Sequence, residues 1–405
     1  MRKNNIIYQL FFLLKNNVIA AALAYAVSIL LARELGPESF GFYSYALIVS
    51  SIASVIVNFS SDSTASIVLA RYNGDKEKVF NLFFSLRIFL YFSYLLLIFF
   101  VSFYDRTLAL SLFFVSLSFL NVSFLYEINK NNIIYSYLFV GERFFYCLIV
   151  FILWILNAIN IEIVFYSIFT SSFIFLVVQF LIYKRYFLNF KLISFSSIFY
   201  LVKDNLYLVL VALSTLSYGG FSRMIMEHKL GLYQLGIYSA GWQLIKVGTL
   251  FQSQLDRVWR LNLSNSLINK NHKELKSIVY RYFIFGTIPV GLFGLFIYLF
   301  AEFIVISLYS REYEELINVI GYISFYLIVI NLDGLARMFW NAVGNRRIYF
   351  IINITISLIM LLVMTFLLNS NELYYYIILV VFFHLFSVFV LFLSFFFIGY
   401  LSNEE

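Results

Sequence analysis

Long apolar runs recur from one end of the chain to the other, and this feature limits the fold more than any other. A bilayer core has no water to satisfy backbone polar groups, so a chain crosses it as helices of about 20 apolar residues. The runs have about this length, and short polar segments separate them. We predict about twelve spans, at residues 6–33, 40–61, 79–104, 107–128, 133–158, 161–183, 197–222, 233–256, 279–308, 315–338, 347–369 and 373–400.

Composition agrees with this interpretation. Only 12% of the residues are charged and 62% are hydrophobic, whereas soluble domains are about 25% charged. The single cysteine, Cys147, lies in an apolar run, so no disulfide framework is expected. Asn16 and Asn17 occur where a signal peptide would have a small-residue cleavage site, so we expect the first span to be retained. The sequence therefore predicts an all-α integral membrane protein.

One pattern, L-G-x-x-x-[FL]-G-x-Y-S, occurs at Leu35–Ser44 and again at Leu230–Ser239, about half a chain length apart. The first glycine can adopt the left-handed conformation that ends a helix, and the second permits close helix packing. The tyrosine suits the membrane interface. The pattern predicts a tight turn between two spans in each of two pseudo-symmetric six-helix bundles, 1–190 and 191–405. Six spans separate the copies, so both halves have the same orientation, and substrate sites in such folds lie between the halves.

Basic residues are unevenly distributed between alternate polar segments, which predicts the orientation of the chain. The segments on the side of the termini carry Arg2, Lys3, Arg71, Lys76, Lys78, Lys130, Lys184, Arg185, Lys191, Lys270, Lys273, Lys276, Arg346 and Arg347. The opposite segments carry Arg33, Arg106, Lys229 and Arg311, with the acids Glu34, Glu38, Asp105, Glu312, Glu314 and Glu315. Loops rich in Lys and Arg stay in the cytoplasm, so both termini are predicted to be cytoplasmic.

No pattern of catalytic or metal-binding residues occurs in the sequence. It has no G-x-x-x-x-G-K-[ST] loop, no H-E-x-x-H and no Cys/His cluster, and His228, His272 and His384 are far apart. The polar segments are too short for a soluble catalytic or nucleotide-binding module. The net charge of +7 has a membrane explanation in the cytoplasmic loops, so nucleic acid is not an expected partner. We expect no enzyme activity, no cofactor and no bound metal.

Charged residues inside the predicted spans are the main candidates for function, because a charge within a membrane is costly and usually faces a cavity or a partner. The basic ones, which we predict to bind substrate, are Lys15, Arg87, Arg143, Arg223, Lys246, Arg257 and Arg337. The acidic ones are Asp62, Glu142, Asp204, Asp256 and Asp333. The structural alternative is that these charges form internal ion pairs or reach to the membrane interface.

Three of the basic residues, Lys15, Arg87 and Lys246, have no acidic residue within one helical turn. They are the best candidates to line a water-filled cationic cavity, and fixed Lys and Arg side chains suit a diphosphate ligand. Arg143, Arg257 and Arg337 each have an acidic residue close along the helix, so ion pairing is an equal alternative for them.

Asp62, Asp333 and His384 are candidates for coupling transport to an ion gradient. A histidine inside a span, such as His384, can respond to protons, and its structural alternative is a hydrogen-bonded packing residue. Arg223 and Asp62 lie near predicted helix ends, which favours a place at the membrane interface for both.

The segment Ala32–Ser44 reads A-R-E-L-G-P-E-S-F-G-F-Y-S. It resembles the A-R-x-L-G-P-x-x-[FY]-G-x-Y start of Wzx-type polysaccharide flippases of the multidrug/oligosaccharidyl-lipid/polysaccharide exporter (MOP) superfamily. The twelve-span, two-half plan agrees with this resemblance over the whole chain. The second copy of the motif departs from the first, because His228 stands where Arg33 does and no proline follows Gly231.

The resemblance implies a V-shaped, MATE-like pair of six-helix bundles that moves undecaprenyl-diphosphate-linked oligosaccharide outward by alternating access. It implies a cationic cavity lined largely by the first, second, seventh and eighth spans, which carry Lys15, Arg223 and Lys246. The expected location is a bacterial cytoplasmic (inner) membrane. The expected partners are the lipid-linked oligosaccharide, membrane lipids, and a polymerase and chain-length regulator of O-antigen, lipopolysaccharide or capsule synthesis.

Two other functions stay open at this point. A drug or cation antiporter of the same superfamily would share the fold, but it would need a compact acidic site, whereas unpaired basic residues dominate the spans. A membrane polysaccharide polymerase would tend to carry a large external loop, and the predicted external loops are only a few residues long. An anionic substrate therefore fits the sequence best.

Overall fold

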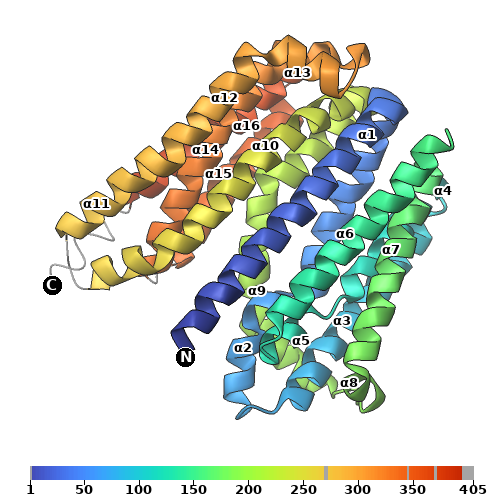
Figure 1. The fold of residues 1–405 in the computed structure, drawn as a ribbon, viewed down its shortest axis with the longest axis vertical. Helices are drawn as coiled ribbons and strands as arrows, with labels where there is room; N and C mark the ends of the chain where they lie inside the picture. The colour runs from blue at the N-terminus through green and yellow to red at the C-terminus, as the bar shows by residue number, and fades with distance from the viewer. Residues whose placement is uncertain (1, 269–271, 344–345, 369–371, 395–405) are drawn as a thin grey trace. The chain divides into compact units, whose positions relative to one another are not determined.

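The computed structural model describes residues 2–268, 272–343, 346–368 and 372–394, and all regular structure in them is helical (Figure 1). The first elements are α1 (Arg2–Asn58), α2 (Ser61–Arg71), α3 (Lys76–Val101), α4 (Arg106–Ser116), η1 (Leu117–Leu120), α5 (Ser123–Ile128), α6 (Asn132–Ile155), α7 (Ile161–Ile182), α8 (Lys184–Leu188) and α9 (Phe195–Leu216). The rest are η2 (Ser217–Phe221), α10 (Ser222–Ile268), α11 (His272–Tyr282), η3 (Phe283–Thr287), α12 (Ile288–Leu299), α13 (Ala301–Leu308), η4 (Arg311–Tyr313), α14 (Glu315–Val343), α15 (Arg346–Leu362), η5 (Val363–Leu367) and α16 (Leu373–Ser394).

Ten stretches of the described residues are long and apolar enough to cross a membrane. Two of them, Phe12–Asn58 and Ser196–Thr249, have 47 and 54 residues, more than twice the about 20 residues that one crossing needs. Each therefore contains two of the predicted spans, so the described stretches agree with a prediction of about twelve crossings. The predicted all-α, multi-span membrane fold is confirmed.

Both long stretches are interrupted at the first glycine of a repeat motif. Gly36 has φ 70° and ψ 170°, and Gly231 has φ 83° and ψ 175°. A positive φ combined with an extended ψ is essentially accessible to glycine alone. This conformation lies outside the left-handed helical region that the sequence suggested, but it has the predicted effect, because it ends one helix and starts the next.

The described chain folds into two compact units. Unit 1 contains the residues up to Ser28 and Ala46–Leu213, and unit 2 contains Ile29–Tyr45 and the residues from Ser214 on. The first repeat motif is therefore part of unit 2, together with the second. The sequence halves 1–190 and 191–405 stay a prediction.

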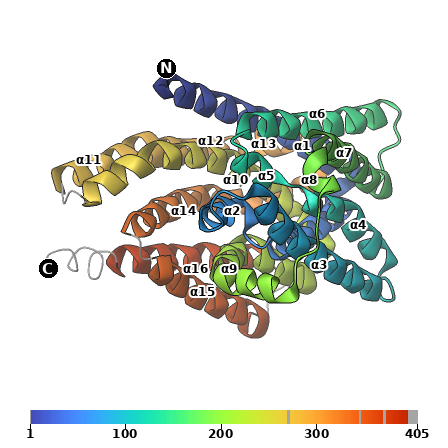
Figure 2. The same cartoon turned by 90° about the horizontal axis from the view of Figure 1, so that it is seen from below.

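In unit 1, the predicted span at 107–128 is broken between η1 and α5. Gln179 of α7 closes the gap: its Oε1 accepts a hydrogen bond of 3.0 Å from the Val122 N–H, and its Nε2 donates one of 3.1 Å to Oδ1 of Asn121. Irregular backbone is tolerated at membrane depth only where protein groups satisfy it. α7 also packs along α6, as Figure 2 shows.

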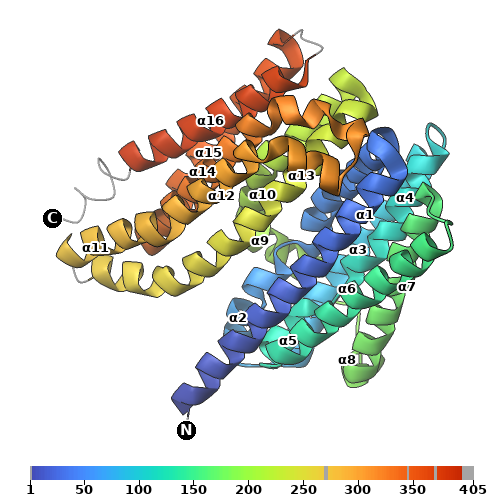
Figure 3. The same ribbon diagram turned by 45° about the horizontal axis from the view of Figure 1, so that its top comes forward.

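In unit 2, α14 is the central helix, and it packs against α10, α12 and α16 (Figures 1 and 3). Its most apolar window is 67% buried inside the protein, the largest share among the described spans. Small residues let the neighbouring backbones approach, since a Cβ added at Gly294 of α12 would lie 2.8 Å from the Ser324 carbonyl oxygen. Polar side chains on α14 are thus shielded from lipid and held in fixed positions.

Candidate functional site

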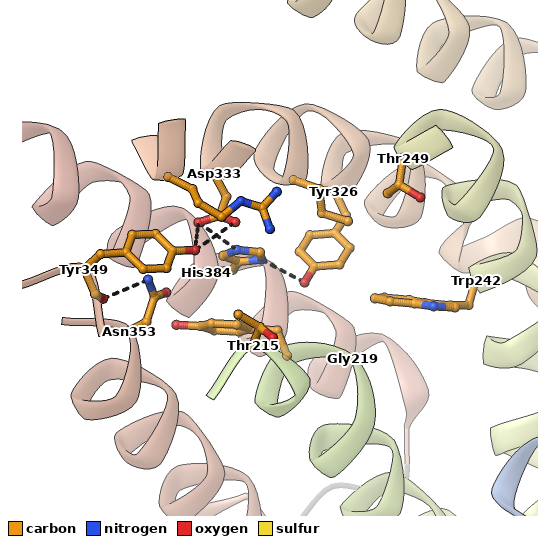
Figure 4. Close-up of a pocket in the computed structure, with 12 residues that line it drawn as sticks. Thr215, Gly219, Trp242, Thr249, Tyr326, Asp333, Tyr349, Asn353 and His384 are labelled. Atoms are coloured by element: carbon orange, nitrogen blue, oxygen red, sulfur yellow. Dashed lines mark hydrogen bonds and ion pairs between the residues drawn. The ribbon is translucent and has the colours of Figure 1, made fainter. Parts of the chain in front are cut away.

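A cavity of about 290 Å³ lies within unit 2 (Figure 4). Its wall is built by α9, η2, α10, α14, α15 and α16, and α14 contributes the most side chains. The lining residues are Thr215, Tyr218, Gly219, Trp242, Thr249, Tyr326, Ile330, Asp333, Arg337, Tyr349, Asn353 and His384. Carboxylate, imidazole, guanidinium, amide and phenol groups therefore meet inside a membrane-spanning bundle, where such groups usually serve function.

Asp333 is the centre of a hydrogen-bonded network in this cavity. The Tyr349 hydroxyl donates to the two carboxylate oxygens of Asp333, at 3.2 and 3.4 Å. Nε2 of His384 lies 3.9 Å from Oδ1 of Asp333, close enough for an ion pair when the imidazole is protonated. On its other side, Nδ1 of His384 lies 2.9 Å from the Tyr326 hydroxyl. The buried imidazole thus links a carboxylate to a phenol, as the dashed lines in Figure 4 show.

Aromatic rings enclose this network. The ring of Tyr218 stacks on His384 with centroids 4.2 Å apart and an angle of 9° between the planes. Trp242 contacts Tyr326 with ring centroids 5.8 Å apart. Tyr218 and Gly219 belong to η2, a π-helical turn, and such turns widen a helix and are frequent at functional sites. The local distortion at η2 therefore shapes one wall of the cavity.

Arg223 lies next to this wall. Its Nε donates to the Gly219 carbonyl oxygen in the π-helical turn, and its guanidinium lies 4.9 Å from the centroid of the Trp242 ring. The side chain thus satisfies backbone that the turn displaces from the regular helical pattern. Arg223 therefore lies beside the cavity wall, and its placement at the membrane interface stays a prediction.

The side chains that line the cavity allow two kinds of chemistry, proton exchange and the binding of a polar ligand. Tyr326, His384 and Asp333 form a continuous line of groups able to exchange a proton. The same carboxylate, the Asn353 amide and the aromatic rings could also hydrogen-bond and stack on a polar ligand. Arg337 shares the wall with Asp333, so the described lining has one acid and one guanidinium and is not a compact acidic site.

The structure brings together three of the predicted site residues in this cavity: Asp333, Arg337 and His384. Arg223 contacts two other lining residues, Gly219 and Trp242. Lys246 lies on α10 with an exposed side chain and is not among the described lining residues. Arg257 lies in α10 as well, but outside the residues whose side chains the structure describes.

The other predicted site residues belong to unit 1. Lys15 is exposed on α1, with its ammonium 5.9 Å from the Phe12 ring centroid. Arg143 on α6 is half-buried, with its guanidinium 5.2 Å from the Phe139 ring centroid. Asp62 on α2 is exposed and accepts a hydrogen bond from the Ser123 hydroxyl. Their roles in binding or coupling stay predictions.

Arg87 is the most enclosed of these residues, at 1% exposure. It donates to the Asn121 carbonyl oxygen and to the Ser61 hydroxyl, and its guanidinium lies 5.2 Å from the Phe124 ring centroid. Asn121 is in the break between η1 and α5, so Arg87 supports the irregular backbone there. Support of this backbone is therefore an alternative to its predicted role as a diphosphate ligand.

Sequence reasoning missed most of the cavity's uncharged polar and aromatic residues, including Tyr218, Trp242, Tyr326 and Tyr349. Among 50 Phe and 32 Tyr, a cavity tyrosine has no distinguishing signal, because lipid-facing and interfacial positions also select aromatic residues. Asn353 could have been found, since a lone amide within an apolar span needs a hydrogen-bond partner.

Comparison with known proteins places the chain in a family. The family model described as "Polysaccharide biosynthesis protein" matches residues 7–253, more than half of the chain. The chain belongs to this polysaccharide biosynthesis family. Among curated proteins, none matches the chain.

Solved transporters share the fold of this polysaccharide biosynthesis protein. An inward-facing multidrug resistance MATE family transporter of the MOP superfamily has a TM-score of 0.70 at 15% identity, over 92% of this chain and 93% of that one. An outward-facing one has a TM-score of 0.62 at 14% identity, over 98% and 97%. A MOP superfamily transporter from Pyrococcus furiosus, described as having a binding pocket of reverse polarity, has a TM-score of 0.61 at 15% identity, over 95% and 94%. The predicted MATE/MOP-like fold is confirmed.

Proposed function

We propose that this protein is a flippase that moves undecaprenyl-diphosphate-linked oligosaccharide from the cytoplasmic to the outer leaflet by alternating access. The product would serve synthesis of a surface polysaccharide such as O-antigen or capsule. The observation that carries this proposal is membership of the polysaccharide biosynthesis family, in a chain with the fold of MOP-superfamily transporters. The Wzx-like motif at Ala32–Ser44 supports the same substrate class.

The intramembrane charges favour an anionic cargo over a cationic one. Lys15 and Lys246 are exposed cations on α1 and α10, two of the helices that the resemblance to Wzx-type flippases assigns to the substrate cavity. A cation antiporter would need a compact acidic site, but the lining of the described cavity contains Arg337 as well as Asp333. A diphosphate matches fixed Lys and Arg side chains in charge and in hydrogen-bonding capacity.

Lys15 and Lys246 give the proposal its test. In liposomes that contain the protein and undecaprenyl-diphosphate-linked oligosaccharide, lectin accessibility would report transfer of the glycan across the bilayer. Lys15→Ala and Lys246→Ala should each lower the transfer rate at least tenfold, and Lys246→Arg should be milder because it keeps the charge. Lys184→Ala, an exposed cation on the short helix α8, is the matched control and should transfer at the parent rate.

Absence of transfer by the parent protein, or normal transfer by the double Lys15→Ala/Lys246→Ala variant, would overturn this assignment. Efflux of a cationic dye by the parent protein, without glycan transfer, would instead support the antiporter.

The membrane potential supplies a driving force for such a cargo. A bacterial membrane is negative inside, and outward movement of one negative charge gains roughly 2.3 kcal/mol per 100 mV. A diphosphate with about two charges would gain about 4.6 kcal/mol per 100 mV if Lys15 and Lys246 stayed fixed while the halves moved. We therefore propose that potential alone biases export, and that Asp62, Asp333 and His384 at most modulate it.

A further inference from the structure

The second glycines of the two repeat motifs, Gly41 and Gly236, make a reciprocal contact inside unit 2. A Cβ added at Gly41 would lie 1.9 Å from the carbonyl oxygen of Leu232, and one added at Gly236 would lie 1.8 Å from that of Pro37. Pro37 and Leu232 are equivalent motif positions, directly after the first glycine. Real Cβ atoms essentially never come within 3.0 Å of such a neighbour, so only glycine at both positions lets the two motif copies pack backbone to backbone.

The segment Tyr309–Glu315, which we call the clasp, connects α13 to α14 and binds the first motif region. The Tyr313 hydroxyl donates a 2.9 Å hydrogen bond to the carbonyl oxygen of Ala32. Oε2 of Glu312 lies 3.0 Å from the position that a Cβ would occupy at Gly36. The clasp therefore contacts the helix before the first motif and the turn within it.

The clasp also binds the second motif region. The Tyr309 hydroxyl donates a 3.0 Å hydrogen bond to the Ala240 carbonyl oxygen. The Tyr233 hydroxyl donates to the Glu312 carbonyl oxygen at 3.3 Å, and Nε2 of Gln234 donates to Glu315 at 2.7 Å. One short segment thus holds both copies of the repeat in their mutual contact.

Tyr309 and Tyr313 are fully buried, at 0% exposure, so these hydrogen bonds form away from water. Burial raises the pKa of Tyr313, which keeps its hydroxyl protonated and able to donate. The last residues of the two motif copies, Ser44 and Ser239, are also buried, at 6% and 1% exposure. The Ser239 hydroxyl is buried and has no hydrogen-bond partner among the described residues, and water would satisfy it if the copies separated.

We propose that the clasp and the two motif glycines form a gate on the side of the protein predicted to face outward. With the clasp bound to both motif copies, the gate is closed. Cargo release on that side requires Ile29–Tyr45 to separate from the rest of unit 2. The gate needs a transported cargo and so rests on the proposed function, but its opening can be measured without knowing the substrate.

Accessibility of Ser44 measures the opening. In a Cys147→Ser background, Ser44→Cys places a thiol at a buried position of the first motif, and the purified protein in detergent is treated with a maleimide. Tyr313→Phe removes the hydroxyl that binds Ala32, and it should raise the labelling rate about fivefold, the effect of one lost hydrogen bond. Gly236→Ala inserts a methyl group into the glycine contact and should raise the rate at least as much.

Two controls separate opening from general loosening. Tyr137→Phe changes an exposed tyrosine of α6, and Gly141→Ala adds a methyl group where no atom lies within 4 Å. Both should label at the parent rate. Size-exclusion profiles confirm folding, and if Gly236→Ala does not fold, Tyr313→Phe alone decides.

An unchanged labelling rate in folded Tyr313→Phe would overturn the gate, as would full reactivity of Ser44→Cys in the parent. In the liposome assay, Tyr313→Phe should change the transfer rate relative to Tyr137→Phe. Faster labelling with an unchanged transfer rate would overturn the role in release. Failure of the parent to transfer any glycan would overturn the flippase function and leave the labelling result standing.

Discussion

Replacing Arg87 distinguishes a substrate ligand from a structural support. Arg87→Ala would remove two hydrogen bonds made by a charged group, to Asn121 and Ser61, each contributing about 1.5–3 kcal/mol. It would also remove a desolvated cation–π contact with Phe124, of about 2 kcal/mol. Release of the buried charge into solvent on unfolding offsets part of this sum. We therefore expect a net loss of about 3–5 kcal/mol in the free energy of unfolding.

Thermal unfolding of the purified protein in detergent would measure this loss. For a chain of 405 residues, a destabilisation of this size corresponds to a fall in Tm of about 5 °C. Arg143→Ala is the matched control, because its guanidinium lies at the same 5.2 Å from a phenylalanine ring but is half-buried. We expect a fall of at most about 1 °C for Arg143→Ala.

Arg87→Lys is a second test of the structural role. Lysine keeps the positive charge, but its ammonium lacks the planar fork of N–H donors with which the guanidinium reaches two acceptors. A structural role predicts that Arg87→Lys is also destabilised by several degrees. Normal thermal stability in both Arg87 variants, together with loss of glycan transfer, would refute the structural argument. It would favour the role of diphosphate ligand that the sequence predicts for Arg87.

Two further predictions concern topology and energetics. Reporter fusions after Lys78 and after Lys276 should both report cytoplasm, because the Lys/Arg bias is on the side of the termini. A fusion near Glu314 should report the outside. Disagreement between the Lys78 and Lys276 fusions would contradict the parallel repeat. In liposomes with a clamped membrane potential and no ion gradient, the rate of outward transfer should respond to the potential. Transfer should also persist in the His384→Ala and Asp333→Asn variants. Transfer that starts only when a proton or sodium gradient is imposed would establish obligatory antiport.

The membrane class, the approximate spans and the glycine turns follow from the sequence because each depends on a single short segment. The length of an apolar run decides whether it can cross a bilayer, and Gly36 and Gly231 mark where the backbone of each motif copy can turn with positive φ. Gly41 and Gly236 also stand at equivalent positions of the two motif copies, which the sequence alone shows. These features require no knowledge of which helices become neighbours.

Tertiary structure decided which side chains meet. The interruption between η1 and α5 is stable only because Gln179 and Arg87, distant in sequence, satisfy its backbone. Asp333 and His384 are separate charged positions in the sequence, and helix packing places them on one cavity with Tyr326 and Tyr349. The hydrogen bond from Tyr313 to Ala32 likewise depends on bringing distant helices together. Hydropathy sets the depth of a residue in the membrane, but only side-chain packing selects the neighbour of each helix face.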